Sequence, residues 1–207
     1  MSCAIARANY QGRIDIMHPD ALAQASMKFQ KARFVVEAMK ADTSSPAVEF
    51  NWEEFLTAAH GIYSKLEQGA KTAPASKVWF NQKKHERRTD PLLTYIHQAR
   101  NAEEHGIERI TARTNSHVSV PPGGMVQFIP QETGGWKVGE TIGEIGYPND
   151  IVALVRVHDR RFGNWFDPPT THLGQEFHDR SALAVAERAI VYLEGILAEA
   201  AALPAVG

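Results

Sequence analysis

Cysteine is almost absent from this chain, and its one example, Cys3, lies next to the N-terminus. A single cysteine allows neither a disulfide framework nor a cysteine-based zinc site within one chain. The sequence also lacks an apolar run long enough to span a bilayer, and its first residues lack the apolar core and cleavage pattern of a secretory signal. These absences predict a soluble cytoplasmic protein that does not enter a membrane.

An excess of positive charge is also missing, because the formal net charge is −2. The chain as a whole therefore has no attraction for nucleic acid, and any RNA affinity must come from a local patch of basic side chains. The sequence contains neither a Gly-rich phosphate loop between a strand and a helix nor a Gly-x-Ser-x-Gly nucleophile elbow. Nothing in it supports a P-loop nucleotidase or a serine hydrolase.

Histidine and aspartate are adjacent in two dipeptides, His158-Asp159 and His178-Asp179, and a further histidine is His172. A metal-dependent phosphohydrolase needs several such ligands directed at one point from facing helices. Here the first dipeptide ends an expected strand, and the second precedes an expected helix, where it suits a cap. We therefore expect no bound metal and no other cofactor.

The sequence does contain clear helical periodicity over its 207 residues. Apolar residues at 22, 25, 29, 32, 36 and 39 predict a core-facing helix that starts near residue 19. After a Ser/Pro turn at residues 42–46, the clearest helix is expected at residues 51–68, with Asn51 as cap and Phe50 packed on Phe55. Its predicted apolar face consists of Trp52, Phe55, Leu56, Ala59, Ile62, Tyr63 and Leu66.

The apolar pattern of the rest of the chain is less regular. A third helix is expected at residues 76–88, and a final one is capped by Ser181 or Asp179. Its predicted buried face consists of Leu183, Ala186, Ile190, Leu193 and Leu197. Between the helices, residues 110–166 combine extended segments with Gly and Pro turns, and residues 150–157 are the clearest strand. Residues 167–174, DPPTTHLG, are expected to be a proline-stiffened loop.

These elements predict a mainly helical fold, a bundle of four to five helices with a small antiparallel β-sheet inserted, α+β overall. We expect one domain over residues 1–207. The bundle would comprise residues 19–107 and 178–202, and the β-rich insertion residues 108–166.

The stretch at residues 90–107, DPLLTYIHQARNAEEHGI, is the most informative part of the chain. Thr89 or Asp90 can cap a helix here, and Pro91 suits its first position because the missing N–H is not needed there. Gly106 is expected to end the helix in the left-handed conformation. The last turns of this helix therefore carry several polar residues close together.

Those residues are Arg100, Asn101, Glu104 and His105, and Asn101 and His105 share a helix face because they are four apart. An Arg followed by a polar residue, then a His after four intervening residues at a helix end, resembles the signature of the HEPN superfamily. These are helical domains, and many of them are metal-independent RNases of defence and toxin systems. The same spacing at residues 13–18 lacks a helical context.

The resemblance implies RNA cleavage in which the ribose 2′-OH attacks the adjacent phosphate. His105 would transfer protons, because imidazole groups titrate near neutral pH. Arg100 would bind the phosphate through its planar fork, and Asn101 would orient phosphate or ribose. Glu104 would hold the imidazole or face solvent. One motif offers one histidine, so the resemblance also implies a two-fold homodimer with a shared cleft, and an antitoxin as possible partner.

A basic run, Lys83, Lys84, Arg87 and Arg88, precedes this helix and supplies candidate RNA-binding residues. Such a run is usually a solvated face. The following helix spans roughly 20 Å, so we expect run and motif to lie apart in one protomer and to share a groove only in a dimer.

Two alternatives remain open for the polar cluster. The domain could bind a nucleotide or a partner protein without catalysis. Equally, Arg100 could form a structural ion pair with Glu103 or Glu104, while His105 caps the negative end of the helix dipole.

Overall fold

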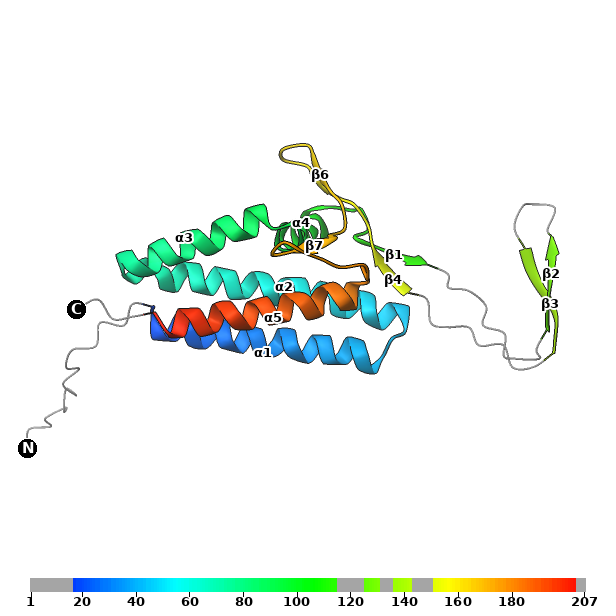
Figure 1. Cartoon of the computed structure of the whole chain (residues 1–207), viewed down its shortest axis with the longest axis horizontal. Coiled ribbons are helices and arrows are strands. Elements are labelled where there is room, and N and C mark those ends of the chain that lie inside the picture. Colours follow the sequence, from blue (N-terminus) through cyan, green and yellow to red (C-terminus); the bar gives the residue numbers. More distant parts are fainter. Residues whose placement is uncertain (1–16, 115–124, 131–135, 143–150, 204–207) are drawn as a thin grey trace, which may run out of the picture.

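The computed structural model describes residues 17–114, 125–130, 136–142 and 151–203. This part of the chain is mainly helical with small antiparallel sheets, as predicted. Its helices are α1 (Pro19–Ala41), α2 (Ser45–Gly69), α3 (Pro74–Thr89), α4 (Pro91–His105) and α5 (Ala182–Ala201), with a 3-10 helix η1 (Ala70–Thr72). Helices α1, α2 and α5 lie side by side, and α3 and α4 pack on α2 (Figure 1). None of these helices is long and apolar enough to cross a membrane.

Helix α2 contributes most to the hydrophobic core. Every residue of its predicted apolar face is buried, and the rings of Trp52 and Phe55 stack with centroids 5.6 Å apart. The predicted start of the helix is wrong, because α2 begins at Ser45, with Pro46 in its first turn. A proline is favourable there because the first N–H groups of a helix have no partner. Asn51 therefore lies inside the helix, and Phe50 is 63% exposed and forms no staple.

The helices on either side of α2 bury small and medium-sized side chains. The predicted face of α1 is buried from Ala25 to Met39, and its first member, Leu22, is partly buried. On α5 the buried stripe is rotated slightly from the predicted one, so that Leu183 and Ile190 are only partly buried. The fully buried α5 positions include Val185, Ala186, Ala189, Leu193 and Ile196. Alanines on this face allow α5 to lie close to α1 and α2.

The β-structure forms four two-stranded antiparallel sheets in the described residues, instead of the single sheet expected. The pairs are β1 (Thr111–Thr114) with β4 (Ile151–Leu154), β2 (Met125–Pro130) with β3 (Trp136–Ile142), β5 (Val157–Asp159) with β6 (Asn164–Phe166), and β7 (Thr171–His172) with β8 (Gln175–Glu176). The strand expected at residues 150–157 is therefore divided into β4 and β5. The division falls at Val155, whose carbonyl accepts a hydrogen bond from the Tyr95 hydroxyl at 2.7 Å.

The segment expected to be a proline-stiffened loop contains strand β7 and the tight turn Leu173-Gly174, both with positive φ. Parts of the expected β-rich insertion, at residues 115–124, 131–135 and 143–150, lie outside the described residues, as do Cys3 and Arg13.

The buried face of α2 gives a first test. Leu56→Ala and Ile62→Ala should each lower the free energy of unfolding by about 2–5 kcal/mol, because these side chains are 1% and 0% exposed and truncation leaves a cavity. Denaturant melts measure this. Phe50→Ala is the matched control and should change stability by less than about 0.5 kcal/mol. Equal effects of all three substitutions would show that the core lies elsewhere.

Candidate functional site

The carboxylate of Asp90 fixes the start of α4. It caps the helix by accepting the Leu93 N–H at 2.9 Å, and it also accepts the Leu173 N–H at 2.7 Å. The His172 Nδ1 atom lies 3.0 Å from the same carboxylate. Burial raises the pKa of Asp90, but these hydrogen bonds outweigh burial, so its pKa is lowered. The predicted cap is thus confirmed, and it also ties α4 to the β7–β8 turn.

The end of α4 differs from the expectation. Gly106 follows the helix with φ −106° and ψ 175°, which is extended and not left-handed. Its N–H donates to the Ala102 carbonyl at 2.7 Å, and a Cβ at position 106 would lie 2.3 Å from that oxygen. Glycine is needed here for close approach to the last turn of the helix.

The four side chains of the polar cluster do come together at this end. Arg100 Nη2 donates to Glu104 Oε1 at 2.5 Å, and Nη1 donates to Asn101 Oδ1 at 3.5 Å. Glu104 Oε2 lies 3.8 Å from His105 Nε2, so its carboxylate stands between the two motif residues. The Arg100 side chain is 18% exposed, whereas that of His105 is 75% exposed. Arg100 is thus held against the bundle and His105 faces solvent.

Arg100 borders a small cavity of about 20 Å³, which we call the inner cavity. Its polar lining consists of His60 and Tyr63 from α2, Arg87 from α3, and His97 and Arg100 from α4. The Nε atoms of Arg87 and Arg100 and the Nδ1 atom of His60 are buried without a hydrogen-bond partner among the described residues. A cavity of this volume can hold one water molecule.

Two histidines stack in the inner cavity, His60 and His97, with ring centroids 6.3 Å apart. Burial, reinforced by the charges of Arg87 and its neighbours, lowers the pKa of His97 to about 4. Burial also lowers the pKa of His60. Neither histidine is among the candidate site residues that the sequence predicts. The sequence does contain a signal for His97, because positions 97, 101 and 105 lie on one face of a helix.

Helix α4 also borders a wider groove of about 620 Å³, which we call the outer groove. Asn101 and His105 line it from α4, and Arg88 lines it from α3. His158 and Arg161 line it from the β5–β6 hairpin. The expected separation of the basic run from the motif is therefore wrong for Arg88. The groove runs along α4 from His97 and is not confined to the end of the helix. Arg88 and the motif residues Asn101 and His105 therefore line the same groove.

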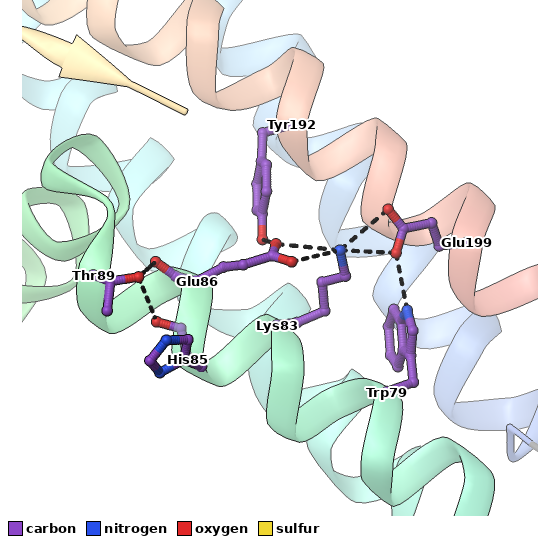
Figure 2. A network of polar contacts seen from close by, with 7 residues as sticks. All are labelled: Trp79, Lys83, His85, Glu86, Thr89, Tyr192 and Glu199. Carbon is purple, nitrogen blue, oxygen red and sulfur yellow. Dashed lines mark hydrogen bonds and ion pairs between the residues drawn. The ribbon is translucent and has the colours of Figure 1, made fainter. Parts of the chain in front are cut away.

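The lysines of the basic run form ion pairs with glutamates of the helix bundle. Lys83 is 9% exposed, and its Nζ lies 3.0 Å from Glu86 Oε1 and 2.9 Å from Glu199 Oε2 (Figure 2). Burial lowers the pKa of Lys83, but its hydrogen bonds to both carboxylates outweigh burial, so its pKa is raised. Lys84 is 3.0 Å from Glu67. A solvated face was expected, but Lys83 is buried between two carboxylates and Lys84 is paired with one.

The aspartates of the two His-Asp dipeptides accept hydrogen bonds from neighbouring backbone N–H groups. Asp159 accepts the N–H groups of Arg161 and Phe162, and Asp179 accepts the N–H of Ser181, whose own side chain caps α5. Within the described ranges, no group of three or more His, Cys, Asp or Glu side chains is placed to hold a metal ion.

The depressed pKa of His97 predicts a pH dependence of stability. Its folded-state pKa of about 4 is below the ordinary value of 6.5, so the unfolded state binds more protons as the pH falls. The free energy of unfolding should therefore decrease between pH 6.5 and pH 4. In denaturant melts across this range, His97→Gln should decrease less steeply than wild type, while exposed His178→Gln should follow wild type. Parallel curves for all three would mean that His97 is not held neutral.

Comparisons with protein-family models, curated proteins and solved structures give no match to this chain.

Proposed function

We propose that this protein is a HEPN-like, metal-independent endoribonuclease whose site is the Arg100–His105 end of α4. The observation that carries the proposal is the position of this end. His105 and Asn101 line the outer groove together with the basic side chains of Arg88 and Arg161, and Arg100 donates a hydrogen bond to Asn101. An exposed imidazole beside several guanidinium groups suits proton transfer next to a bound phosphate.

In the proposed reaction, the ribose 2′-oxygen attacks the adjacent phosphorus and the bond from phosphorus to the 5′-oxygen breaks. The 2′-OH proton goes to a base, and an acid protonates the departing 5′-oxygen. The products are a 2′,3′-cyclic phosphate and a 5′-hydroxyl. His105 carries out proton transfer, Arg100 stabilises the negative phosphoryl oxygens, and Asn101 orients the ribose or the phosphate.

Glu104 has a defined part in this scheme. In the free protein its carboxylate forms an ion pair with the Arg100 guanidinium and lies next to His105. A phosphate must replace Glu104 on Arg100, which the bidentate fit of guanidinium to phosphate favours. Glu104 then remains as the anion that faces His105.

The reaction needs an acid and a base, whereas each motif contains one histidine. We propose that a second copy of the chain supplies the other His105, in a two-fold homodimer whose α4 ends meet. The exposure of the His105 side chain, 75%, leaves it free for such a meeting.

The catalytic assignment has a direct test. His105→Ala should lower the rate of RNA cleavage about 10²–10⁴-fold, the usual effect of removing a general acid or base. Its thermal melt should match wild type because the side chain is 75% exposed. Arg100→Ala should weaken both cleavage and RNA binding. Cleavage of a labelled oligoribonucleotide measures the rate, and exposed His178→Ala is the control. A fully active His105→Ala variant would remove His105 from the mechanism.

A non-catalytic module that binds a nucleotide or a protein is the second candidate. The observation in its favour is that Arg100 is only 18% exposed and already paired with Glu104. Wild-type protein that binds oligonucleotides without cleaving them would establish this function instead. If Arg100→Ala lowers the melting temperature and changes nothing else, the ion pair is structural.

The proposed nucleophile belongs to the RNA, so a chelator should not change the rate. Cleavage assays with and without EDTA should agree within experimental error. Activity that is lost with EDTA and restored by a divalent cation would contradict the proposed mechanism. It would indicate that carboxylates and histidines of the groove bind a metal ion.

A further inference from the structure

We propose that the β5–β6 hairpin is a base-stacking platform that makes single-stranded RNA the ligand of the outer groove. As a statement about substrate class it rests on the proposed function, but the binding itself does not depend on cleavage.

The tip of the hairpin is held in one conformation. Asp159 Oδ1 accepts hydrogen bonds from the N–H groups of Arg161 at 2.9 Å and Phe162 at 3.3 Å. The backbone carbonyl of Asp159 accepts a hydrogen bond from the Gly163 N–H at 2.7 Å. Gly163 has φ +73°, a value that glycine adopts readily. This turn directs Phe162 outward, where it lines the groove and remains 68% exposed.

A second exposed aromatic side chain, Trp165 on β6, lies beside the groove residue His158. Trp165 stacks on His158 with ring centroids 4.4 Å apart and an interplanar angle of 14°, yet it is 50% exposed. The Arg156 guanidinium lies 5.1 Å from the Trp165 ring, and that of Arg161 lies 5.1 Å from the Phe162 ring. Exposed aromatic rings accompanied by arginines are the combination with which proteins hold single strands, by stacking bases and contacting phosphates.

The charges of the groove favour the same ligand. Arg160 is 3.2 Å from Glu108 and is neutralised by it. Arg88 and Arg161 form no ion pair with any carboxylate in the described part of the chain. Two guanidinium groups are thus available for phosphates in a protein whose net charge is −2. An acidic protein segment would use these charges but has no need of two exposed aromatic rings.

The arrangement selects a single strand over a duplex. Bases in a duplex are stacked on one another and cannot lie on Phe162 or Trp165, whereas unpaired bases can. Asn101 and His105 line the same groove as Phe162 and Arg161, so a strand stacked on the hairpin would pass its backbone along the end of α4.

Binding is measured by fluorescence anisotropy of a labelled oligouridine of about twelve nucleotides, in the His105→Ala background to prevent cleavage. A blunt RNA duplex of equal length should bind less tightly. Phe162→Ala and Trp165→Ala should each raise the Kd roughly 5- to 100-fold, the equivalent of one lost stacking contact. Trp165→Phe should retain most of the affinity, which separates stacking from hairpin folding. Phe34→Ala, an aromatic residue 75% exposed on α1, should leave the Kd unchanged.

The phosphate contacts have an independent readout. Arg88→Ala and Arg161→Ala should each reduce the slope of log K against log salt by about 0.7, the value for one phosphate of a single strand. Exposed Arg33→Ala, also on α1, should not change the slope.

Equal affinity of wild type and Phe162→Ala for the oligouridine, tighter binding of the duplex, or no binding of either RNA would overturn the platform. The last result, with an acidic polypeptide bound instead, would assign the hairpin to a protein partner. Oligouridine binding that depends on Phe162 and Trp165 supports the platform whether or not the wild type cleaves RNA. A wild type that binds in this way without cleavage would refute the proposed function alone.

Discussion

The structure depends most on one buried carboxylate. Asp90, 7% exposed, lies where α3 passes into α4 and accepts hydrogen bonds from both the helix it starts and the β7–β8 turn. A buried charge is tolerated only when several donors surround it, and here two backbone N–H groups and an imidazole do so. His172 in turn packs edge-on against Tyr192 of α5, with ring centroids 5.6 Å apart. The direction of α4, and with it the position of the polar cluster, follows from this one set of contacts.

A second, partly buried network holds α3 against α5. The Tyr192 hydroxyl donates to Glu86 at 2.8 Å and the Trp79 indole N–H donates to Glu199 at 3.0 Å, with Lys83 between the two carboxylates (Figure 2). Each charge in this network has an opposite charge and a further hydrogen bond, so burial is compensated. Because Lys83 faces α5, the next turn of α3 directs Arg87 into the inner cavity and leaves Arg88 at the outer groove.

Local patterns in the sequence predicted the helices, apart from the start of α2 and the backbone at Gly106, but not the segments between them. The apolar stripe of α2 and the Asp90 cap depend on residues within one or two turns, and both are present in the structure. The division of residues 150–157 into two strands depends on Tyr95, which is distant in sequence and takes the Val155 carbonyl. The burial of Lys83 depends in the same way on Glu199. The cluster of Arg100, Asn101, Glu104 and His105 was predictable because it is local, whereas its place beside the β5–β6 hairpin required the tertiary structure.

Helix α4 borders two compartments, the inner cavity and the outer groove. Arg100 borders the inner cavity, Asn101 and His105 line the outer groove, and His97 borders both. Successive residues of a helix are rotated by about 100°, so the assignment of each side chain to a compartment is set by its count from Asp90. Adding or removing one residue between Asp90 and Arg100 would turn each of these side chains through that angle, away from the compartment that it now borders. The chain length between these two residues is therefore as strict a requirement as the identity of the residues themselves.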